Sequence, residues 1–303
     1  MGVTSMQRLR FKKIDAFVSG RSPGNPAGCI YLDRPDGLTA DQMQQIAREM
    51  AGCVSEVVFV STEEGHTTLR FFSAEREVAF CGHGTIAAMY DLVRTTPVLQ
   101  LDPVLRIRIG GREMLVRNEV AGNDAVFISA PLPQAVPVTP GLNPDAIAAA
   151  LRIPPGDIAD PAGITAINAG LATLLVPLRS LSAVLSTHPD PANLKEFCLK
   201  HGIEIVLVYT AEVSTRGASF RTRVFAPIFG YLEDPATGSG NAAFGYLLLA
   251  RNLWEGKLIS IEQGKSRDHP NIIRLTADAS EKQRTVFFGG NAVVRIEGEY
   301  LLQ

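Results

Sequence analysis

Two short segments of the chain bring glycines together with side chains that could do chemistry. FCGHGTIAAMY at residues 80–90 and ATGSGNAAFGY at residues 236–246 each lead into an apolar, alanine-rich stretch. When they are aligned, the following pairs coincide: Cys81 with Thr237, Gly82 with Gly238, His83 with Ser239, and Gly84 with Gly240. Glycines let a backbone approach a ligand closely, and the free amides of a helix N-terminus suit an anion. Both segments are therefore predicted to begin helices that hold a substrate carboxylate and stabilise a developing enolate.

Candidates for proton transfer lie in or beside these segments. Glu56 opens the apolar run EVVFV, where burial would raise its pKa towards that of a general base, and Ser55 could steady it or bind substrate. Asp234 precedes the second segment, and His83 could carry a proton or donate to substrate. Ordinary alternatives stay open: a strand-end charge in water for Glu56, a turn acid before Pro235 for Asp234, and a structural imidazole for His83.

Cys81 raises the question of thiol chemistry. A helix N-terminus would lower its pKa, and a cofactor-free racemase places an acid and a base on opposite faces of the reacting carbon. The position that mirrors Cys81 holds Thr237, whose hydroxyl is too weak an acid to act as the second thiol. A symmetrical two-thiol mechanism is therefore not predicted, and Cys81 is interpreted as a residue near the substrate, with single-base catalysis as the alternative.

Two other kinds of site fit these residues less well. His83 is not part of H-E-x-x-H or another metal-ligand spacing, so no metal site is predicted. Both glycine segments match G-x-G-x-x-A, a form of the dinucleotide fingerprint, with Asp102 following the first. That fingerprint requires a leading βαβ unit, whereas these segments lie inside each half among antiparallel-looking strands, which disfavours a nucleotide site.

The elements that must position these residues occur twice in the same order. The first half has strand patterns near 9–18, 27–32, 55–61 and 67–73, a helix pattern within 38–52 with Thr39 as N-cap, a helix from about Gly82 to Val93, and strands near 104–109, 113–118 and 125–129. The second half has strands at 168–178, 203–210 and 221–225, helices at 190–202 and from Gly238, and four more strands within 258–298. The repeat indicates an α+β fold of two similar lobes, with chance similarity as the alternative, and the proline-rich residues 131–144 read as a linker.

Bulk composition limits the kinds of partner. The 303 residues are 46% hydrophobic and 20% charged, as in soluble globular proteins, and a net charge of −2 predicts neither a nucleic-acid nor a membrane partner. Apolar runs are too short to cross a bilayer, and separated cysteines indicate reduced thiols in the cytoplasm. The remaining candidates are interpreted as structural: Cys29, Cys53 and Cys198 as packing residues, His66, His188, His201 and His269 as surface residues, and Glu233 as a solvated turn residue.

Six segments in order resemble a known family: DAFVSGRSPGNPAG, QMQQIAREMAGCVSEVVFV, LRFFSAEREVAFCGHGTIAA, FAPIFGYLEDPATGSGNAA, SIEQG and GGNAVVRIEGE. This is the phenazine-biosynthesis PhzF-like family, which has the diaminopimelate epimerase fold, and the resemblance spans nearly the whole chain. It implies two pseudo-symmetric lobes, each a curled mixed sheet or barrel around a central helix, with the active site in the cleft between them. The predicted lobes are residues 1–130, joined by a returning strand at about 291–303, and residues 131–290.

The resemblance also implies roles for individual residues. The family's general acid/base glutamate falls on Glu56, its cleft histidine on His83 and its aspartate on Asp234. The amides that grip the substrate carboxylate fall on Gly82, His83, Gly238 and Ser239. The sequence departs from the family where CVSE replaces the common NLSE and where Cys81 replaces an alanine.

The predicted function is a PhzF-type isomerase that moves a proton on a small carboxylate-bearing substrate without a cofactor, as a homodimer. Glu56, His83 and Asp234 are the predicted catalytic residues. The predicted substrate-binding residues are Ser55, Cys81, Gly82, Gly84, Thr237, Gly238 and Ser239. One alternative is an amino- or imino-acid epimerase, or a hydroxyproline-type dehydratase, with Cys81 as the single base. Another is a non-catalytic protein that binds small carboxylates.

Overall fold

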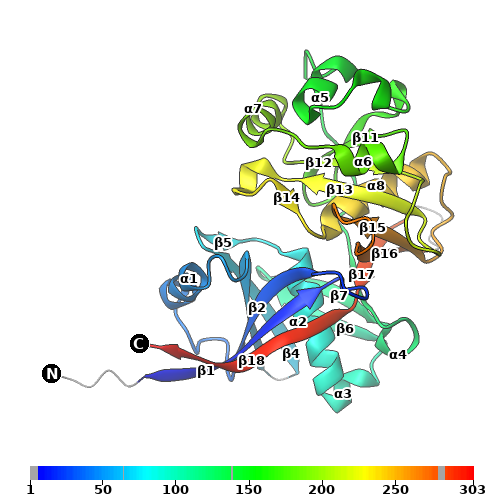
Figure 1. The fold of residues 1–303 in the computed structure, drawn as a ribbon. Helices are drawn as coiled ribbons and strands as arrows, with labels where there is room; N and C mark the ends of the chain where they lie inside the picture. Colours follow the sequence, from blue (N-terminus) through cyan, green and yellow to red (C-terminus); the bar gives the residue numbers. More distant parts are fainter. Residues whose placement is uncertain (1–5, 64, 138, 279–283) are drawn as a thin grey trace. The chain divides into compact units, whose positions relative to one another are not determined.

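Two compact units make up the part of the chain that the computed structural model describes, residues 6–63, 65–137, 139–278 and 284–303. Unit 1 lies within Met1–Val18, Pro23–Ile128 and Gly289–Gln303, and unit 2 within Ser19–Ser22 and Ser129–Phe288. Figure 1 shows helices and strands mixed in both units. The predicted α+β class is confirmed.

Unit 1 is built on a mixed sheet. Its strands are β1 (Gln7–Ala16), β2 (Asn25–Leu32), β3 (Glu56–Glu63), β4 (His66–Ser73), β5 (Glu77–Val78), β6 (Val104–Ile109), β7 (Arg112–Asn118), β8 (Val126–Ser129, whose last residue falls in unit 2) and β18 (Ala292–Leu302). β1 pairs antiparallel with both β2 and β18, so the C-terminal strand lies beside the N-terminal one. β2 pairs parallel with β3, and β3 pairs antiparallel to β4. β4 pairs parallel with β6, and β6 pairs antiparallel to β7.

Helix α2 (Gly82–Thr95) lies among these strands (Figure 1) and is buried along most of its length. It packs against β1, β2, β3 and β18. Because such a helix has little contact with solvent, its acidic residue Asp91 must be neutralised within the fold. Lys12 Nζ donates to both Asp91 carboxylate oxygens at 2.8 and 2.9 Å, and the Tyr31 hydroxyl donates at 2.5 Å. The predicted helix therefore forms, and this network fixes it against the sheet.

Helix α1 (Ala40–Glu49) confirms the predicted amphipathic helix and its cap. The Thr39 hydroxyl accepts from the Gln42 amide at 3.3 Å, and the Gln42 side chain accepts from the Thr39 amide at 2.9 Å, which is a capping box. Its apolar face, with Met43 and Ile46, packs into a cluster that includes β3 residues. Two short helices complete unit 1, α3 (Pro97–Gln100) and α4 (Val120–Asn123).

Unit 2 repeats the strand pairing of unit 1. Its strands are β9 (Gln134–Ala135), β10 (Thr165–Asn168), β11 (Ala172–Pro177), β12 (Ile205–Thr210), β13 (Phe220–Phe225), β14 (Glu233–Asp234), β15 (Ile259–Gln263), β16 (Asn271–Ala277) and β17 (Val286–Gly290, which ends in unit 1). β10 pairs antiparallel to β11, β11 parallel with β12, β12 antiparallel to β13, β13 parallel with β15, and β15 antiparallel to β16. This is the alternation found from β1 to β7, so the two lobes are similar, as predicted.

Helices pack on both faces of the unit 2 sheet. Helix α8 (Gly238–Ala250) is almost wholly buried, and its Gly240 approaches Ile205 and Leu207 of β12. Val206 and Val208, which alternate with them and so face the other way, belong to a cluster formed with the outer helices. Those helices are α5 (Pro144–Leu151), α6 (Leu181–Ser186) and α7 (Pro191–His201), with 3₁₀ turns at η1 (Pro155–Asp157), η2 (Pro161–Gly163) and η3 (Pro227–Phe229).

Four minor expectations are wrong. Residues 134–135 add strand β9 to the sheet, so the proline-rich segment is more than a linker. Cys53 is exposed and packs no core, whereas His201 is only 2% exposed and its ring contacts Phe197. Glu233 is not a solvated turn residue, because both of its carboxylate oxygens accept from the buried Arg223 guanidinium at 2.9 Å.

The core of unit 2 contains an ion pair between Arg221 of β13 and Glu262 of β15. Both side chains are 0% exposed, and an Arg221 Nη1–Glu262 Oε2 distance of 3.0 Å joins them. Ser214 donates to the same carboxylate through its amide and hydroxyl, and Arg221 donates to the carbonyl of Gly264 at 2.7 Å. This network ties the end of β15 to the loop between β12 and β13, which contains Ser214.

Replacing Gly238 with Ala is expected to lower the free energy of unfolding by about 1–3 kcal/mol, since overpacking a well-filled core costs about that much. A Cβ at this position would lie 2.2 Å from Cε2 of the fully buried Phe288. Gly156→Ala is the matched control, because a Cβ there would meet no atom within 4 Å. Urea unfolding measures both variants, and equal unfolding midpoints would contradict the close contact.

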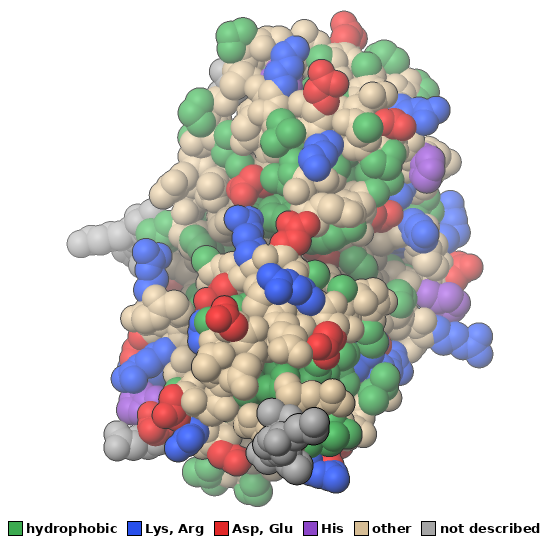
Figure 2. All heavy atoms as spheres, turned by 90° about the vertical axis from the view of Figure 1, so that its left-hand side faces the viewer, with side chains coloured by type: hydrophobic (Ala, Val, Ile, Leu, Met, Phe, Trp, Pro, Cys, Tyr) green, Lys and Arg blue, Asp and Glu red, His purple; other side chains and the backbone are tan. Residues whose placement is uncertain are grey.

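Acidic and basic side chains are interspersed over the face shown in Figure 2, in keeping with the formal net charge of −2. None of the helices in the described part of the chain combines the length and apolar character that a bilayer crossing needs.

Candidate active site

Unit 1 places Glu56 at the first position of a central strand. β3 lies between β2 and β4, with Glu56 opposite Ala27 on one side and Ser73 on the other. The side chain of Glu56 is 16% exposed, whereas the preceding Ser55 is exposed. The interpretation of Glu56 as a strand-end charge in open water is therefore wrong.

The N-terminus of α2 is organised by Cys81. The backbone of Cys81 is extended, and its sulfur accepts from the Gly84 amide at 3.3 Å, so the thiol itself caps the helix. Thr85 Oγ1 donates to the Cys81 carbonyl at 2.8 Å. Gly84 is needed here because a Cβ would lie 2.7 Å from Val58 Cγ2 on β3. The glycine thus lets the first turn of α2 come close to the strand that carries Glu56.

Glu56, Cys81 and His83 meet in one cluster. His83 Nε2 lies 3.3 Å from Glu56 Oε2, and the Cys81 sulfur lies 3.5 Å from His83 Nδ1 and 3.7 Å from Nε2. One donor atom from each of the three side chains lies within 4.8 Å of the others. Glu56 Oε2 is shielded from solvent and has no hydrogen-bond partner in the described part of the chain. The cluster therefore places a shielded carboxylate oxygen beside an imidazole without a formed hydrogen bond between them.

The pKa of Glu56 is lowered, contrary to expectation. Burial raises the pKa of the carboxyl, but the close, charged His83 imidazole and the Ser55 hydroxyl outweigh it, so the net shift is downward. The apolar neighbours alone suggested the opposite direction. Glu56 is consequently a carboxylate near neutral pH, which is the form that accepts a proton.

His83 and Cys81 also have displaced pKa values. Burial lowers the pKa of the His83 imidazole, but the adjacent Cys81 sulfur and Glu56 carboxylate raise it well above its usual range. Burial raises the pKa of the Cys81 thiol, and the nearby His83 and Gly84 amide only partly offset this. The predicted lowering of the Cys81 pKa by the helix N-terminus is therefore wrong. Because the thiol is neutral, we take the Glu56 carboxylate to be the counter-charge of a His83 imidazolium.

In unit 2 the equivalent helix N-terminus is held by a different network. The Thr237 hydroxyl does not cap α8 but donates to Asp234 Oδ2 at 2.6 Å. Gln263 Oε1 accepts from the Thr237 amide at 3.0 Å and from Asn241 Nδ2 at 2.7 Å. Gln263 Nε2 donates to the Asp234 carbonyl at 2.8 Å. A hydrogen bond thus joins Asp234 and Thr237, and the buried side-chain amides of Gln263 and Asn241 support them.

Sequence reasoning missed Gln263 and Asn241 as part of this arrangement. Both are 0% exposed. The sequence did contain one signal, because Asn241 is a polar residue among small and apolar ones, four positions after Thr237. At that spacing its side chain can donate to the Thr237 carbonyl, and it does so at 2.9 Å. Gly238 and Ser239 lie on the first turn of α8, as predicted, and Gly238 packs against Phe288.

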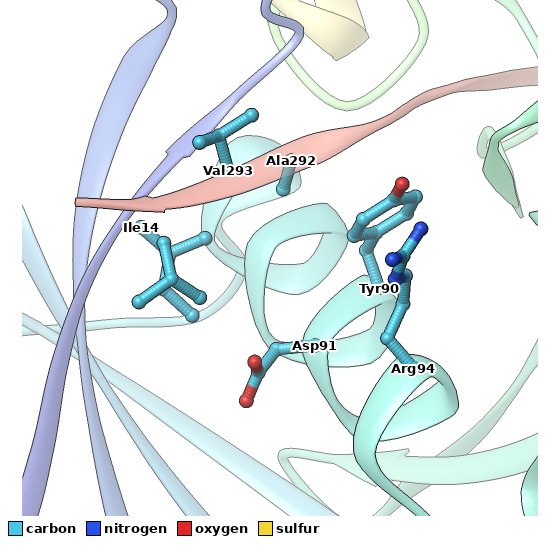
Figure 3. Close-up of a pocket in the computed structure, with 7 residues that line it drawn as sticks. Ile14, Tyr90, Asp91, Arg94, Ala292 and Val293 are labelled. Atoms are coloured by element: carbon cyan, nitrogen blue, oxygen red, sulfur yellow. The ribbon is translucent and has the colours of Figure 1, made fainter. Parts of the chain in front are cut away.

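A cavity of about 320 Å³ in unit 1 lies away from the cluster of Glu56, Cys81 and His83. Figure 3 shows that it is bounded by Tyr90, Asp91 and Arg94 of α2 and by Ile14, Ala292 and Val293 of β1 and β18. Its α2 residues lie about two helical turns beyond the Cys81–Gly84 turn. The oxygens of Asp91 are already engaged by Lys12 and Tyr31, so the cavity has no acid available for chemistry.

Comparison with solved structures places the fold. A phenazine biosynthesis protein of the PhzF family from Bacillus anthracis superposes with a TM-score of 0.80, at 24% identity over 98% of this chain and 100% of that one. A hydroxyproline epimerase from Agrobacterium vitis shares the fold more distantly, with a TM-score of 0.60 at 12% identity over 98% of this chain and 92% of that one. The chain therefore has the α+β fold that this PhzF-family protein and the epimerase share.

Sequence comparison then gives the family. The chain belongs to the PhzC-PhzF family of phenazine biosynthesis-like proteins, whose family model matches residues 14–298. It is 31% identical to trans-2,3-dihydro-3-hydroxyanthranilate isomerase of Pseudomonas chlororaphis, over 95% of this chain and 98% of that protein. It is also 31% identical to the "Uncharacterized isomerase YfhB" of Bacillus subtilis, over 95% of this chain and 97% of that protein. The relatives are named isomerases, and this chain is an enzyme of that kind.

Proposed function

We propose that this isomerase moves a proton on a small, unsaturated, carboxylate-bearing substrate, with Glu56 as the general acid and base and without a cofactor. The observation that carries the proposal is Glu56 Oε2, which is shielded, lacks a hydrogen-bond partner in the described chain and lies 3.3 Å from His83 Nε2. A carboxylate in this state can accept a proton from carbon without first breaking a strong hydrogen bond.

The proposed reaction has two proton transfers. Glu56 takes a proton from an sp³ carbon, and the electron pair of that C–H bond spreads into the conjugated system and the substrate carboxylate. The same proton, or one exchanged with solvent, then adds to another carbon of the system, and the double bonds shift. His83 is proposed to balance the charge of Glu56 and to hand protons to it, since its imidazole lies beside the carboxylate.

First-turn amides are proposed to bind anionic groups of the substrate. In unit 1 these are the amides of Gly82 and His83, which begin α2, and in unit 2 those of Gly238 and Ser239, which begin α8. First-turn amides have no partner within their helix, and the helix dipole favours an anion there. Asp234 is proposed to hold a polar substituent of the substrate or relay a proton, because Thr237 and Gln263 fix its position.

The substrate class follows from the relatives. One curated relative at 31% identity isomerises trans-2,3-dihydro-3-hydroxyanthranilate, as its name states, and we propose a cyclic or conjugated hydroxy- or amino-carboxylate of similar size for this chain. The test is incubation of the purified protein with that compound and with a panel of small unsaturated carboxylates, followed by proton NMR. Migration of a double bond in at least one compound is expected, and unchanged spectra across the panel would contradict the proposal.

A single-base mechanism through Cys81 is the second candidate, favoured by the position of its sulfur 3.5 Å from His83. The raised pKa of the buried thiol argues against it. Cys81→Ser, which retains an oxygen to cap α2, is expected to keep kcat within about tenfold, because general acid–base catalysis would remain with Glu56. Steady-state kinetics checks this. A loss of about 10³-fold or more in a folded variant would instead identify the thiol as the base.

The homodimer expected from the family resemblance stays a prediction. Analytical ultracentrifugation of the purified chain would show a single species of twice the 32.6 kDa chain mass.

A further inference from the structure

The three side chains of the unit 1 cluster bring three possible metal-ligand atoms together. In tetrahedral zinc sites, the metal lies about 2.3 Å from a sulfur ligand and about 2.0–2.1 Å from nitrogen and oxygen ligands. These bond lengths place a sulfur and a nitrogen ligand about 3.5 Å apart, and a nitrogen and an oxygen ligand about 3.3 Å apart. Here the Cys81 sulfur lies 3.7 Å from His83 Nε2, and that nitrogen lies 3.3 Å from Glu56 Oε2. The sulfur also lies 3.5 Å from Nδ1, so it faces both ring nitrogens. To seat an ion, the His83 ring must therefore turn until Nε2 points at it, while the donor atoms of all three side chains already lie within 4.8 Å of one another.

A second observation points to a ligand at the same place. Glu56 Oε2 is shielded from solvent and makes no hydrogen bond in the described chain, and its contact with His83 Nε2 at 3.3 Å is a charge pair without hydrogen-bond geometry. A bound cation would satisfy it directly. The ligand set of one thiolate, one imidazole and one carboxylate suits Zn²⁺ and chemically similar ions such as Co²⁺, and hard ions such as Mg²⁺ far less.

The elements hold these donors in place. Cys81 is fixed as the N-cap of α2 by the Gly84 amide, and Glu56 is fixed at the start of β3 between two paired strands. His83 is 11% exposed in its side chain and lies on the first turn of α2. The spacing of these residues along the sequence does not indicate a metal site, because Glu56 lies on β3 whereas Cys81 and His83 lie at the start of α2.

We propose that Glu56, Cys81 and His83 bind one divalent ion of the Zn²⁺ type, and that this ion inhibits the enzyme. On binding, a metal–sulfur bond replaces the S–H bond of Cys81, and a metal–nitrogen bond forms at His83 Nε2. The displaced protons go to solvent. The ion also occupies Oε2 of Glu56, the atom assigned to proton transfer. The inhibition rests on the proposed function, whereas the binding does not.

The test uses Co²⁺ as the spectroscopic probe and the full-length protein freed of metal with a chelator. Binding is expected at one ion per chain, with a thiolate-to-cobalt charge-transfer band and intense visible bands typical of tetrahedral coordination. Cys81→Ser should lose the charge-transfer band. His83→Gln should weaken binding by more than about 100-fold, since loss of an outer-shell partner alone costs about 10–100-fold.

Matched controls separate this site from adventitious binding. Cys53→Ser removes an exposed thiol of the same unit and His66→Gln an exposed imidazole, and both should bind Co²⁺ as the wild type does. A spectrum lost in Cys53→Ser but kept in Cys81→Ser would overturn the proposal, as would the absence of saturable binding in the wild type.

The activity measurement separates the two proposals. Zn²⁺ should abolish turnover by the wild type at one equivalent per chain, and a chelator should restore it. Co²⁺ binding by a protein that isomerises no compound of the panel would support the metal site while removing the proposed function. Turnover that persists when the cobalt spectrum is saturated would refute inhibition by the ion.

Discussion

Glu56→Gln is expected to lower kcat by about 10²–10⁴-fold, the usual contribution of a general acid–base group. The amide is close in shape to the carboxylate but cannot accept a proton from carbon. The variant should fold, because Glu56 Oε2 makes no hydrogen bond in the described chain that the substitution would break, and His83 can release its proton once its counter-charge is gone. KM should change little, since the proposed carboxylate contacts are made by backbone amides and not by Glu56. Steady-state kinetics on the substrate identified by NMR would measure both constants.

Glu63→Gln is the matched control for this variant. Glu63 lies at the other end of the same strand, β3, and its side chain is exposed. The Glu63→Gln variant should retain wild-type kcat, because Glu63 lies far along the strand from the cluster of Glu56, Cys81 and His83. Equal activity of Glu56→Gln and Glu63→Gln would show that Glu56 does not move the proton.

Glu262→Gln is expected to lower the free energy of unfolding by about 3–5 kcal/mol, because removing one partner of a buried ion pair leaves the other charge unpaired. Arg221, 0% exposed, would keep its guanidinium in the core of unit 2 without a counter-charge. The variant would also weaken the bonds from Ser214 that join the loop to β15. Chemical denaturation of the full chain would measure the loss.

The same carboxylate predicts a pH dependence. Burial raises the pKa of Glu262, but bonds from Ser214, Thr215 and Arg221 outweigh it and lower the pKa below its usual value. A lowered folded-state pKa gives stability above the unfolded-state value, about 4.3 for Glu, which is lost as pH falls through the folded-state pKa. The difference between wild type and Glu262→Gln should therefore be full at pH 7 and shrink below about pH 4.

Glu255→Gln is the control for this pair. Glu255 also pairs with a cation, Lys257, but both side chains are more than 80% exposed. Exposed ion pairs contribute about 0–1 kcal/mol, so little change is expected. Equal destabilisation by the two substitutions would contradict the account of the buried pair.

The local patterns of the sequence predicted most of the elements. The sequence predicted Thr39 as the N-cap of α1 and the glycine segments as the starts of α2 and α8, as the structure has them. Apolar periodicity and glycines act over a few residues, so they can be recognised in sequence. The similarity of the two halves was also visible there, and the strand pairing bears it out.

Properties that depend on tertiary packing could not be predicted from the sequence. The direction of the Glu56 pKa shift depends on the approach of His83 from another element, and apolar neighbours in sequence suggested the wrong sign. The thiol of Cys81 is buried, so the helix N-terminus does not lower its pKa as expected. The support of Asp234 and Thr237 by Gln263 joins β15 to α8, a contact that no local pattern contains.

The most direct test of the central claim is deuterium incorporation during turnover. The wild-type enzyme in D₂O is predicted to introduce deuterium into the product at the carbon that receives the proton, at the rate of isomerisation. Glu56→Gln is predicted to lower that rate by about 10²–10⁴-fold, whereas Cys81→Ser and Glu63→Gln stay near the wild type. Mass spectrometry and NMR would locate and count the label. Unchanged incorporation by Glu56→Gln would contradict the assignment of Glu56 as the group that moves the proton.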